Sequence, residues 1–152
     1  MAAKKYSFKL KSKLSELDKL CQHLEKVGQS IGLSQRAVFE INLALDELFT
    51  NIISYGFSDD DVHDIKISIT PQGNQITISI EDDGVPFNPV DAETPDLECS
   101  IENCKIGGLG IHIIKKLMDQ VCYQRCDNKN VLTLKKTIKD VRSSKKQKFV
   151  SH

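Results

Sequence analysis

The segment SQRAVFEINLALDELFTNIISYGF, residues 34–57, predicts a long helix with one buried face. Its apolar residues recur at every third or fourth position, which is the spacing of a stripe along one side of a helix. Ser34 is the expected N-cap of this helix, and Gly56 is expected to end it. The stripe that a sheet or another helix should cover consists of Val38, Ile41, Leu45, Leu48, Ile52 and Tyr55.

Glu47 and Asn51 fall beside that stripe, one helical turn apart. Because side chains at i and i+4 are neighbours on a helix surface, this carboxylate and carboxamide can share one ligand or ion. A solvated helix shoulder would show the same two residues, and for this segment alone it is the commoner case. The choice between the two interpretations therefore depends on segments further along the chain.

The 152 residues suffice for one domain with a single core, and their composition is that of an ordinary soluble globular protein. The formal net charge of zero favours neither a nucleic acid nor a membrane as a partner. No run of residues is long and apolar enough to span a bilayer, and the first residues lack the apolar stretch of a signal peptide. We therefore expect a cytoplasmic protein.

The five cysteines are an odd number and show no CxxC spacing. Free thiols in a reducing compartment are the expected state. The alternative is a zinc site built from Cys99, Cys104 and His112, which is disfavoured because structural zinc usually has more tightly spaced ligands.

Period-two alternation of apolar and polar residues predicts strands in three places. These are a strand over residues 6–10, a hairpin of residues 65–69 and 76–80, and a closing hairpin of residues 121–126 and 131–138 with its turn at residues 127–130. Helical spacing predicts a further helix between Ser12, its expected N-cap, and Gly32, its expected end. The buried stripe of that helix should be Leu14, Leu17, Leu20, Leu24, Val27 and Ile31.

Asp82 continues the inward-facing positions of the strand that ends in Ile80, whereas Asp83 should point outward. An acid at the inward end of a strand needs a hydrogen-bonding partner, because an unpaired buried carboxylate is costly. The simpler alternative is that Asp82 caps the turn at Gly84.

Residues 88–106 show no sustained periodicity, and a connection of this length is usually a functional loop, a lid or a disordered segment. The glycines of GGLG, residues 107–110, then lead into a helix. Glycines at a helix start let a ligand approach the backbone, and the exposed N–H groups favour phosphate, although a flexible loop would contain the same glycines. The segment is not a P-loop, because no Gly-Lys-Ser/Thr follows, and no strand leads directly into it as in a Rossmann motif.

The order of these elements predicts an α+β fold, a two-layer α/β sandwich with helices on one face of a mixed, mostly antiparallel sheet. Taken together, ELFTN (47–51), DDGVPF (82–87) and GGLGI (107–111) resemble the three boxes of the GHKL, or Bergerat-fold, ATP-binding superfamily. DDGVPFNP and GGLGIHIIKKLMDQV are most similar to the RsbW-type anti-sigma-factor serine/threonine kinases of bacteria. The resemblance implies one ATP-binding domain over residues 1–138. Residues 139–152 have few apolar and many basic side chains, which predicts a basic, disordered tail.

The resemblance also implies ATP and Mg²⁺ as cofactors and a role for each box. Asn51 corresponds to the asparagine that supplies an oxygen to the Mg²⁺ on the nucleotide phosphates. Glu47 matches the acid of the same box, which is the candidate base for the substrate hydroxyl. Asp82 corresponds to the aspartate that accepts a hydrogen bond from the adenine amino group, and Gly84 allows the backbone to turn there.

The glycine-rich box should contact the phosphates through Gly108, Leu109 and Gly110, and residues 88–106 resemble the ATP lid. Some relatives carry an arginine just before these glycines, where this chain has Ile106 with Lys105 beside it. Lysine can neutralise phosphate charge but lacks the two-pronged geometry of arginine.

Two further departures are Pro86, in place of the second glycine of DxGxG, and Tyr55, where many relatives have histidine. Together with Ile106, these departures affect the expectation of phosphotransfer more than the expectation of ATP binding.

The implied function is that of an ATP-dependent protein serine/threonine kinase that phosphorylates a small anti-sigma-factor-antagonist-like protein. In the family, the unphosphorylated partner releases a sigma factor or another client from the kinase. A homodimer is expected on the same ground, with no direct nucleic-acid or membrane partner. The alternatives are an ATP-sensing binding module that sequesters a partner without kinase activity, and a detached histidine-kinase catalytic domain. Glu47 favours the kinase over the binding module.

Overall fold

The computed structural model describes residues 4–89 and 107–138. Several predicted features lie outside these residues: Lys105, two of the cysteines and the basic tail. Most of the predicted lid lies outside them as well. The elements are β1 (Tyr6–Lys11), a 3₁₀ turn η1 (Leu14–Glu16), α1 (Leu17–Ile31), α2 (Gln35–Tyr55), β2 (Asp64–Gln72), β3 (Gln75–Asp82), α3 (Gly107–Leu117), β4 (Gln120–Cys126) and β5 (Lys129–Thr137).

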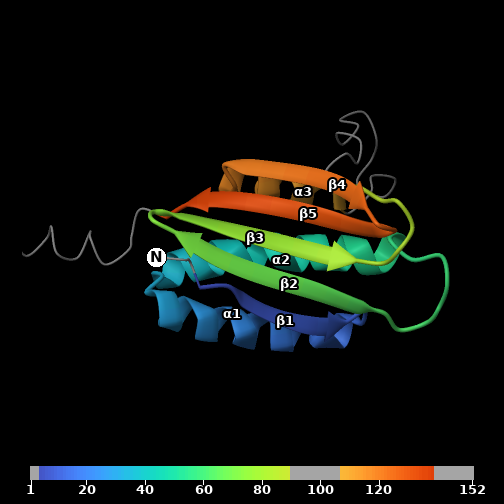
Figure 1. Cartoon of the computed structure of the whole chain (residues 1–152), viewed down its shortest axis with the longest axis horizontal. Helices are drawn as coiled ribbons and strands as arrows, with labels where there is room; N and C mark the ends of the chain where they lie inside the picture. The colour runs from blue at the N-terminus through green and yellow to red at the C-terminus, as the bar shows by residue number, and fades with distance from the viewer. Residues whose placement is uncertain (1–3, 90–106, 139–152) are drawn as a thin grey trace, which may run out of the picture.

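The strands form one five-stranded sheet in the order β1-β2-β3-β5-β4, and the helices lie behind one face of it (Figure 1). This arrangement confirms the predicted α+β two-layer sandwich. Within the described residues every neighbouring pair is antiparallel, so the sheet is more uniform than the mixed one we expected. None of the described helices has the length and apolar character that crossing a membrane requires.

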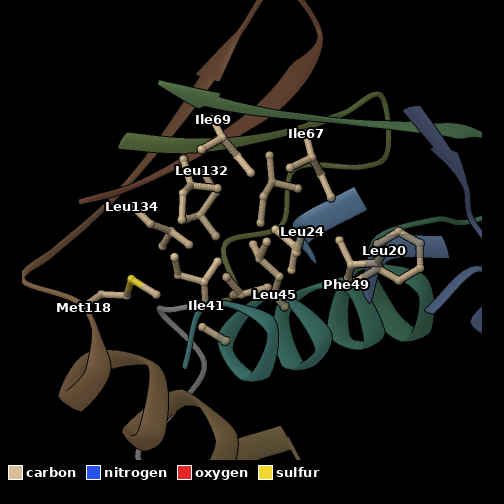
Figure 2. Close-up of a cluster of buried hydrophobic side chains, with 14 of the residues drawn as sticks. Leu20, Leu24, Ile41, Leu45, Phe49, Ile67, Ile69, Met118, Leu132 and Leu134 are labelled. Carbon is tan, nitrogen blue, oxygen red and sulfur yellow. The ribbon is translucent and has the colours of Figure 1, made fainter. Parts of the chain in front are cut away.

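The core lies between the helices and the inner face of the sheet, as Figure 2 shows. Inward positions of β2 and β3 alternate with outward ones, and the inward isoleucines are all buried. The core side chains labelled in Figure 2 are Leu20, Leu24, Ile41, Leu45, Phe49, Ile67, Ile69, Met118, Leu132 and Leu134. Burial of this apolar surface is the main source of stability, because each such side chain contributes roughly 1.5–3 kcal/mol when removed from water.

Helix α2 follows the prediction closely. The Ser34 hydroxyl accepts a hydrogen bond from Ala37 N at 3.0 Å, so Ser34 is the N-cap, and Gly56 follows the last helical residue. The predicted stripe is buried or half-buried as far as Ile52. Tyr55 was predicted to be buried, but it is 52% exposed. It occupies the last helical position, and Phe49, which we had not assigned to the stripe, is buried instead.

Two expectations for the start of α1 are wrong. The 3₁₀ turn comes first, so α1 begins at Leu17 and its N-cap position is Glu16 rather than Ser12. The Ser12 hydroxyl instead accepts a hydrogen bond from His63 N at 2.8 Å. Leu14, placed in the predicted stripe, lies in the 3₁₀ turn and is exposed. Gly32 ends α1 in the left-handed conformation, as predicted.

The turn between β4 and β5 is shorter than the predicted four residues. Only Asp127 and Asn128 form it, with φ angles of 52° and 64°. Two successive residues with positive φ make a tight hairpin turn whose twist matches that of the strands. Lys129 and Asn130, which we had placed in the turn, therefore belong to β5, and Asn130 lies opposite Asp82 of β3.

A lysine on the inner face of β5 connects three elements. Lys136 is 9% exposed, and its ammonium group lies 3.0 Å from Glu40 Oε1 on α2. It also donates a hydrogen bond of 2.9 Å to Leu117 O at the end of α3. Because the hydrogen bond from Lys136 stabilises the charged carboxylate, the pKa of Glu40 is lowered. Lys136 thus positions the helix that begins with the glycine-rich box.

Replacement of Lys136 by methionine should keep the volume and remove the charge. We expect the free energy of unfolding to fall by about 1–3 kcal/mol, since Leu117 O loses this donor and Glu40 loses its nearest cation. Urea denaturation of the wild type and Lys136→Met measures the difference.

The contribution of Glu40 to this difference depends on pH. Because its folded-state pKa is lowered, that contribution is present at neutral pH and is lost as the pH falls through the lowered pKa. Lys135→Met, on the opposite face of the same strand, is the control and should change stability by less than about 0.5 kcal/mol. Equal losses in both variants would contradict the assignment.

Candidate functional site

A buried carboxylate lies at the end of β3. Asp82 is 4% exposed, on the inner face of the sheet, as the alternation predicted. Its Oδ1 accepts hydrogen bonds of 2.9 Å from Gly84 N and 2.9 Å from Asn130 Nδ2. Burial raises the pKa of Asp82, and these two hydrogen bonds oppose the increase. The turn-capping alternative is thus correct for Oδ1, but the cap is part of a buried polar cluster.

Asn130 is the centre of that cluster, and sequence reasoning missed it. Its amide nitrogen also donates to Val85 O at 2.8 Å, and its Oδ1 accepts hydrogen bonds from Phe87 N and from the Tyr123 hydroxyl. One side chain on β5 therefore holds Asp82 and the backbone that follows it. The available signal was the Asp127-Asn128 pair, since a two-residue turn places Asn130 on the inner face.

Arg125 of β4 holds the same turn from a third strand. Its Nη1 donates to Gly84 O at 2.8 Å and to Asn130 Oδ1 at 3.2 Å. Hydrogen bonds from β4 and β5 thus keep the Asp82–Phe87 backbone in place, and they do so on the side of the sheet that the helices cover.

The turn also contacts the end of α2. Val85 N donates to Gly56 O at 2.8 Å, and the Tyr55 and Phe87 rings lie 6.1 Å apart between centroids. A Cβ atom on Gly84 would lie 2.0 Å from Gly56 O, which no side chain permits. The close approach of two backbones therefore requires glycine at position 84, which adds a physical reason to the predicted role of Gly84 in the turn.

Glu47 and Asn51 lie on α2 near this end of the helix. Asn51 is buried, and its side chain hydrogen-bonds the Glu47 carboxyl, so the structure brings the predicted pair together. Burial raises the pKa of Glu47, and the hydrogen bond from Asn51 partly offsets this. A carboxylate with a raised pKa beside an amide oxygen can accept a proton or contribute to an oxygen-rich ion site.

The glycine-rich box forms the first turn of α3, which begins at Gly107 and packs against α2. Gly108, Leu109 and Gly110 are therefore at the N-terminal end of a helix, the position that the sequence predicted. Lys105 and Ile106 lie outside the described residues.

The described residues contain no group of three or more histidine, cysteine, aspartate or glutamate side chains arranged to hold a metal. Of the residues proposed for zinc, His112 is exposed, and Cys99 and Cys104 lie outside the described part. The cysteines that the structure describes, Cys21, Cys122 and Cys126, are free thiols.

Asn130→Ala tests the importance of the cluster. The variant leaves Asp82 Oδ1 with the Gly84 N–H and removes a donor from Val85 O, so we expect the free energy of unfolding to fall by about 1–3 kcal/mol. The loss should be largest at neutral pH, and should decrease as the pH falls through the pKa of Asp82, because Asn130 stabilises the charged carboxylate. Denaturation of Asn74→Ala, in the exposed β2–β3 turn, provides the control. An equal effect in both would argue against the cluster.

Comparison with known proteins places these features in a family. The model of the histidine kinase-like ATPase domain matches residues 10–136, which include Glu47, Asn51, Asp82, Asn130 and the glycine-rich box. The solved structure of a blue-light activated histidine kinase from Erythrobacter litoralis has a TM-score of 0.53 with 14% identity, and the match covers 86% of this chain and 42% of that one. At this identity the likeness concerns the fold alone.

Relatives similar in sequence are bacterial proteins named as protein kinases or as an anti-sigma factor. Serine/threonine-protein kinase BtrW of Bordetella bronchiseptica is 30% identical over 111 residues, 73% of this chain and 78% of that protein. Serine-protein kinase RsbW of Listeria monocytogenes is 28% identical over 105 residues, 64% of this chain and 65% of that protein. Anti-sigma F factor of Oceanobacillus iheyensis is 32% identical over 82 residues, 54% of this chain and 56% of that protein. The chain therefore belongs to the family of histidine kinase-like ATPase domains, and it is similar within that family to the RsbW-type serine-protein kinases.

Proposed function

We propose that this protein is an ATP-dependent protein serine/threonine kinase whose substrate is a small anti-sigma-factor-antagonist-like protein. The observation that carries the proposal is the buried Asp82 carboxylate, held by Asn130 beside the end of the helix that bears Glu47 and Asn51. The names of the relatives, serine-protein kinase and anti-sigma F factor, support the same reading. A sigma factor or similar client, and a homodimer, are further parts of the proposal.

Asp82 is the residue proposed to recognise adenine. Among the residues that the structure describes, both hydrogen bonds of Asp82 go to Oδ1, so Oδ2 is the oxygen available to accept a hydrogen bond from the adenine amino group. A carboxylate held in one orientation by buried donors selects a ligand that presents a donor of its own. Gly84 contributes by allowing the backbone to pass close to Gly56.

Asn51 and Glu47 are the residues proposed to act at the phosphate end. The Asn51 side-chain oxygen fits Mg²⁺, a hard cation that prefers oxygen ligands, and the phosphates and water would supply its other ligands. When bound, the ion neutralises phosphate charge. Backbone N–H groups of Gly108, Leu109 and Gly110 would face the phosphates at the start of α3, and Lys105 would add positive charge.

The proposed reaction is in-line phosphoryl transfer. The oxygen of a serine or threonine hydroxyl on the partner forms a bond to the terminal phosphorus, the bond between that phosphorus and ADP breaks, and Glu47 accepts the hydroxyl proton. Positioning supplies most of the stabilisation in such reactions, so Glu47 need only orient the hydroxyl and take its proton late. Its raised pKa suits a general base that acts near neutral pH.

The deciding experiment adds Mg-ATP and a small antagonist-like protein to the purified chain and follows the terminal phosphate. Phosphoserine or phosphothreonine on the partner would establish the kinase. ATP binding with a stable complex and no transfer would favour the sequestering module, and Ile106, in place of an arginine, would be the first residue to change. Absence of nucleotide binding would refute the proposed site.

Asp82→Asn should weaken nucleotide binding. Gly84 N and Asn130 Nδ2 both donate to one position, so the new amide must turn its oxygen toward them and its NH₂ group toward the adenine amino group. We expect affinity to fall by at least about tenfold, the effect of leaving one buried donor unpaired. Isothermal titration calorimetry measures it, with Asp18→Asn on the exposed side of α1 as control. Unchanged affinity would remove the adenine assignment.

Glu47→Gln should keep nucleotide affinity and slow phosphoryl transfer by about 10²–10⁴-fold, the usual contribution of a general base. In the wild type, the transfer rate should fall as the pH drops through the raised pKa of Glu47, because the protonated carboxyl cannot accept the proton. Single-turnover kinetics across this pH range provide the measurement. Glu25→Gln on α1 is the control, and full activity of Glu47→Gln would show that Glu47 is not the base.

A further inference from the structure

His63 lies between α2 and β2, and its backbone is held by Ser12. Its N–H donates to Ser12 Oγ at 2.8 Å, and its carbonyl accepts a hydrogen bond of 2.9 Å from Ser12 N. Its ring stacks on the Phe57 ring, with centroids 4.3 Å apart and planes 9° apart. The side chain is only 18% exposed, so the imidazole is confined to one place beside the turn that follows β3.

Both ring nitrogens of His63 face a carboxylate. Nε2 lies 2.7 Å from Asp59 Oδ1, and Nδ1 lies 3.0 Å from Asp83 Oδ1. A neutral imidazole donates through only one nitrogen, whereas an imidazolium donates through both. The two hydrogen bonds are therefore both complete only when His63 is protonated.

Asp83 belongs to the turn of the proposed nucleotide site. It stands between Asp82, whose side chain points inward, and Gly84, whose backbone touches Gly56. The hydrogen bond from Val85 N to Gly56 O already joins this turn to the end of α2. The contact from His63 to Asp83 is a second connection between the turn and the segment that leaves α2.

We propose that protonated His63 positions the Asp82–Gly84 turn against the end of α2 and thereby makes nucleotide binding dependent on pH. The inference rests on the proposed function, because it concerns the same nucleotide site. His63 acts through Asp83 and is a positioning residue. None of the residues assigned to adenine, phosphate or Mg²⁺ has to change its protonation for the effect to occur.

The surroundings of His63 favour the charged ring. The hydrogen bond to Asp59 raises the pKa of His63 most, partial burial opposes it, and the charge of Asp83 adds to the increase. The open hollow of about 460 Å³ that His63 and Asp83 line has charged side chains of both signs on the neighbouring strands. They are Lys9, Lys11, Asp64, Lys66, Glu81 and Lys129.

Within that set, Lys11 pairs with Asp64 at 3.0 Å and Lys129 lies 3.5 Å from Glu81. The charged groups that hydrogen-bond the ring are Asp59 and Asp83, and both favour its protonation. Since the pKa of His63 is raised in the folded protein, the contact is fully present below the ordinary histidine value of about 6.5. As the pH rises through the raised pKa, the ring keeps only one donor, so the pair of hydrogen bonds is incomplete and nucleotide affinity should fall over the same range.

The test is calorimetric titration of the full chain with Mg-ADP at several pH values between about 5.5 and 8.5, where histidine titrates. The wild type should lose affinity by about two- to fivefold with rising pH, as expected for a partly exposed charged pair. His63→Gln should bind at all pH values as the wild type does at high pH.

His23→Gln is the matched control. His23 also stacks on an aromatic ring, that of Phe8, with centroids 4.2 Å apart, but burial and two nearby lysines lower its pKa. This variant should keep the pH dependence of the wild type. Titration of the ligand itself is common to all three proteins, so it cancels in the comparison. The same pH dependence in His63→Gln as in the wild type would overturn the proposal.

Nuclear magnetic resonance of the nucleotide-free protein separates this proposal from the proposed function. The amide signals of residues 83–85 should shift with the same midpoint as the His63 ring, and this shift should be absent in His63→Gln. If these amides follow His63 but no nucleotide binds at any pH, the kinase function and the pH-dependent binding both fail, while the positioning contact stands. Amides that do not follow the ring would overturn the positioning contact itself.

Discussion

The buried carboxylate of Asp82 is the constraint on which the rest of the site depends. A charged oxygen at the inner end of a strand must receive hydrogen bonds, because leaving it unpaired costs several kcal/mol. One donor is local, the N–H of Gly84, and the other comes from Asn130, 48 residues away. Asn130 can reach Asp82 only because β5 pairs with β3, although α3 and β4 lie between them in the chain.

Helix α2 couples the core to the site. Its buried stripe covers the sheet, while Glu47 and Asn51 lie on its flank and Gly56 at its end accepts the hydrogen bond from Val85. The apolar residues of the stripe thereby fix the positions of Glu47 and Asn51. The tight contact between Gly56 and Gly84 has no space for a side chain, so the two segments can approach only at this glycine.

Periodicity predicted most elements correctly, and the errors have local causes. The helix over residues 34–57, the central hairpin and the inward direction of Asp82 follow from spacing alone. Ser12 failed as an N-cap because a 3₁₀ turn intervenes, and Tyr55 failed as a core residue because the helix ends there. Asn130 was missed because the four polar residues 127–130 resemble a loop. Only Asp127 and Asn128, at positive φ, form the turn, and Asn130 belongs to β5.

The sequence by itself determined the α+β class, the family resemblance and the positions of Glu47, Asn51, Asp82 and the glycine-rich box, because these depend on spacing within short segments. Only the tertiary structure decided which distant side chains hold them. Asn130 and Arg125 hydrogen-bond the turn after β3, Lys136 hydrogen-bonds the end of α3, and His63 hydrogen-bonds Asp83. The physical reason is that a hydrogen bond between remote residues depends on strand order and register. Both result from packing of the whole chain, and no local pattern records them.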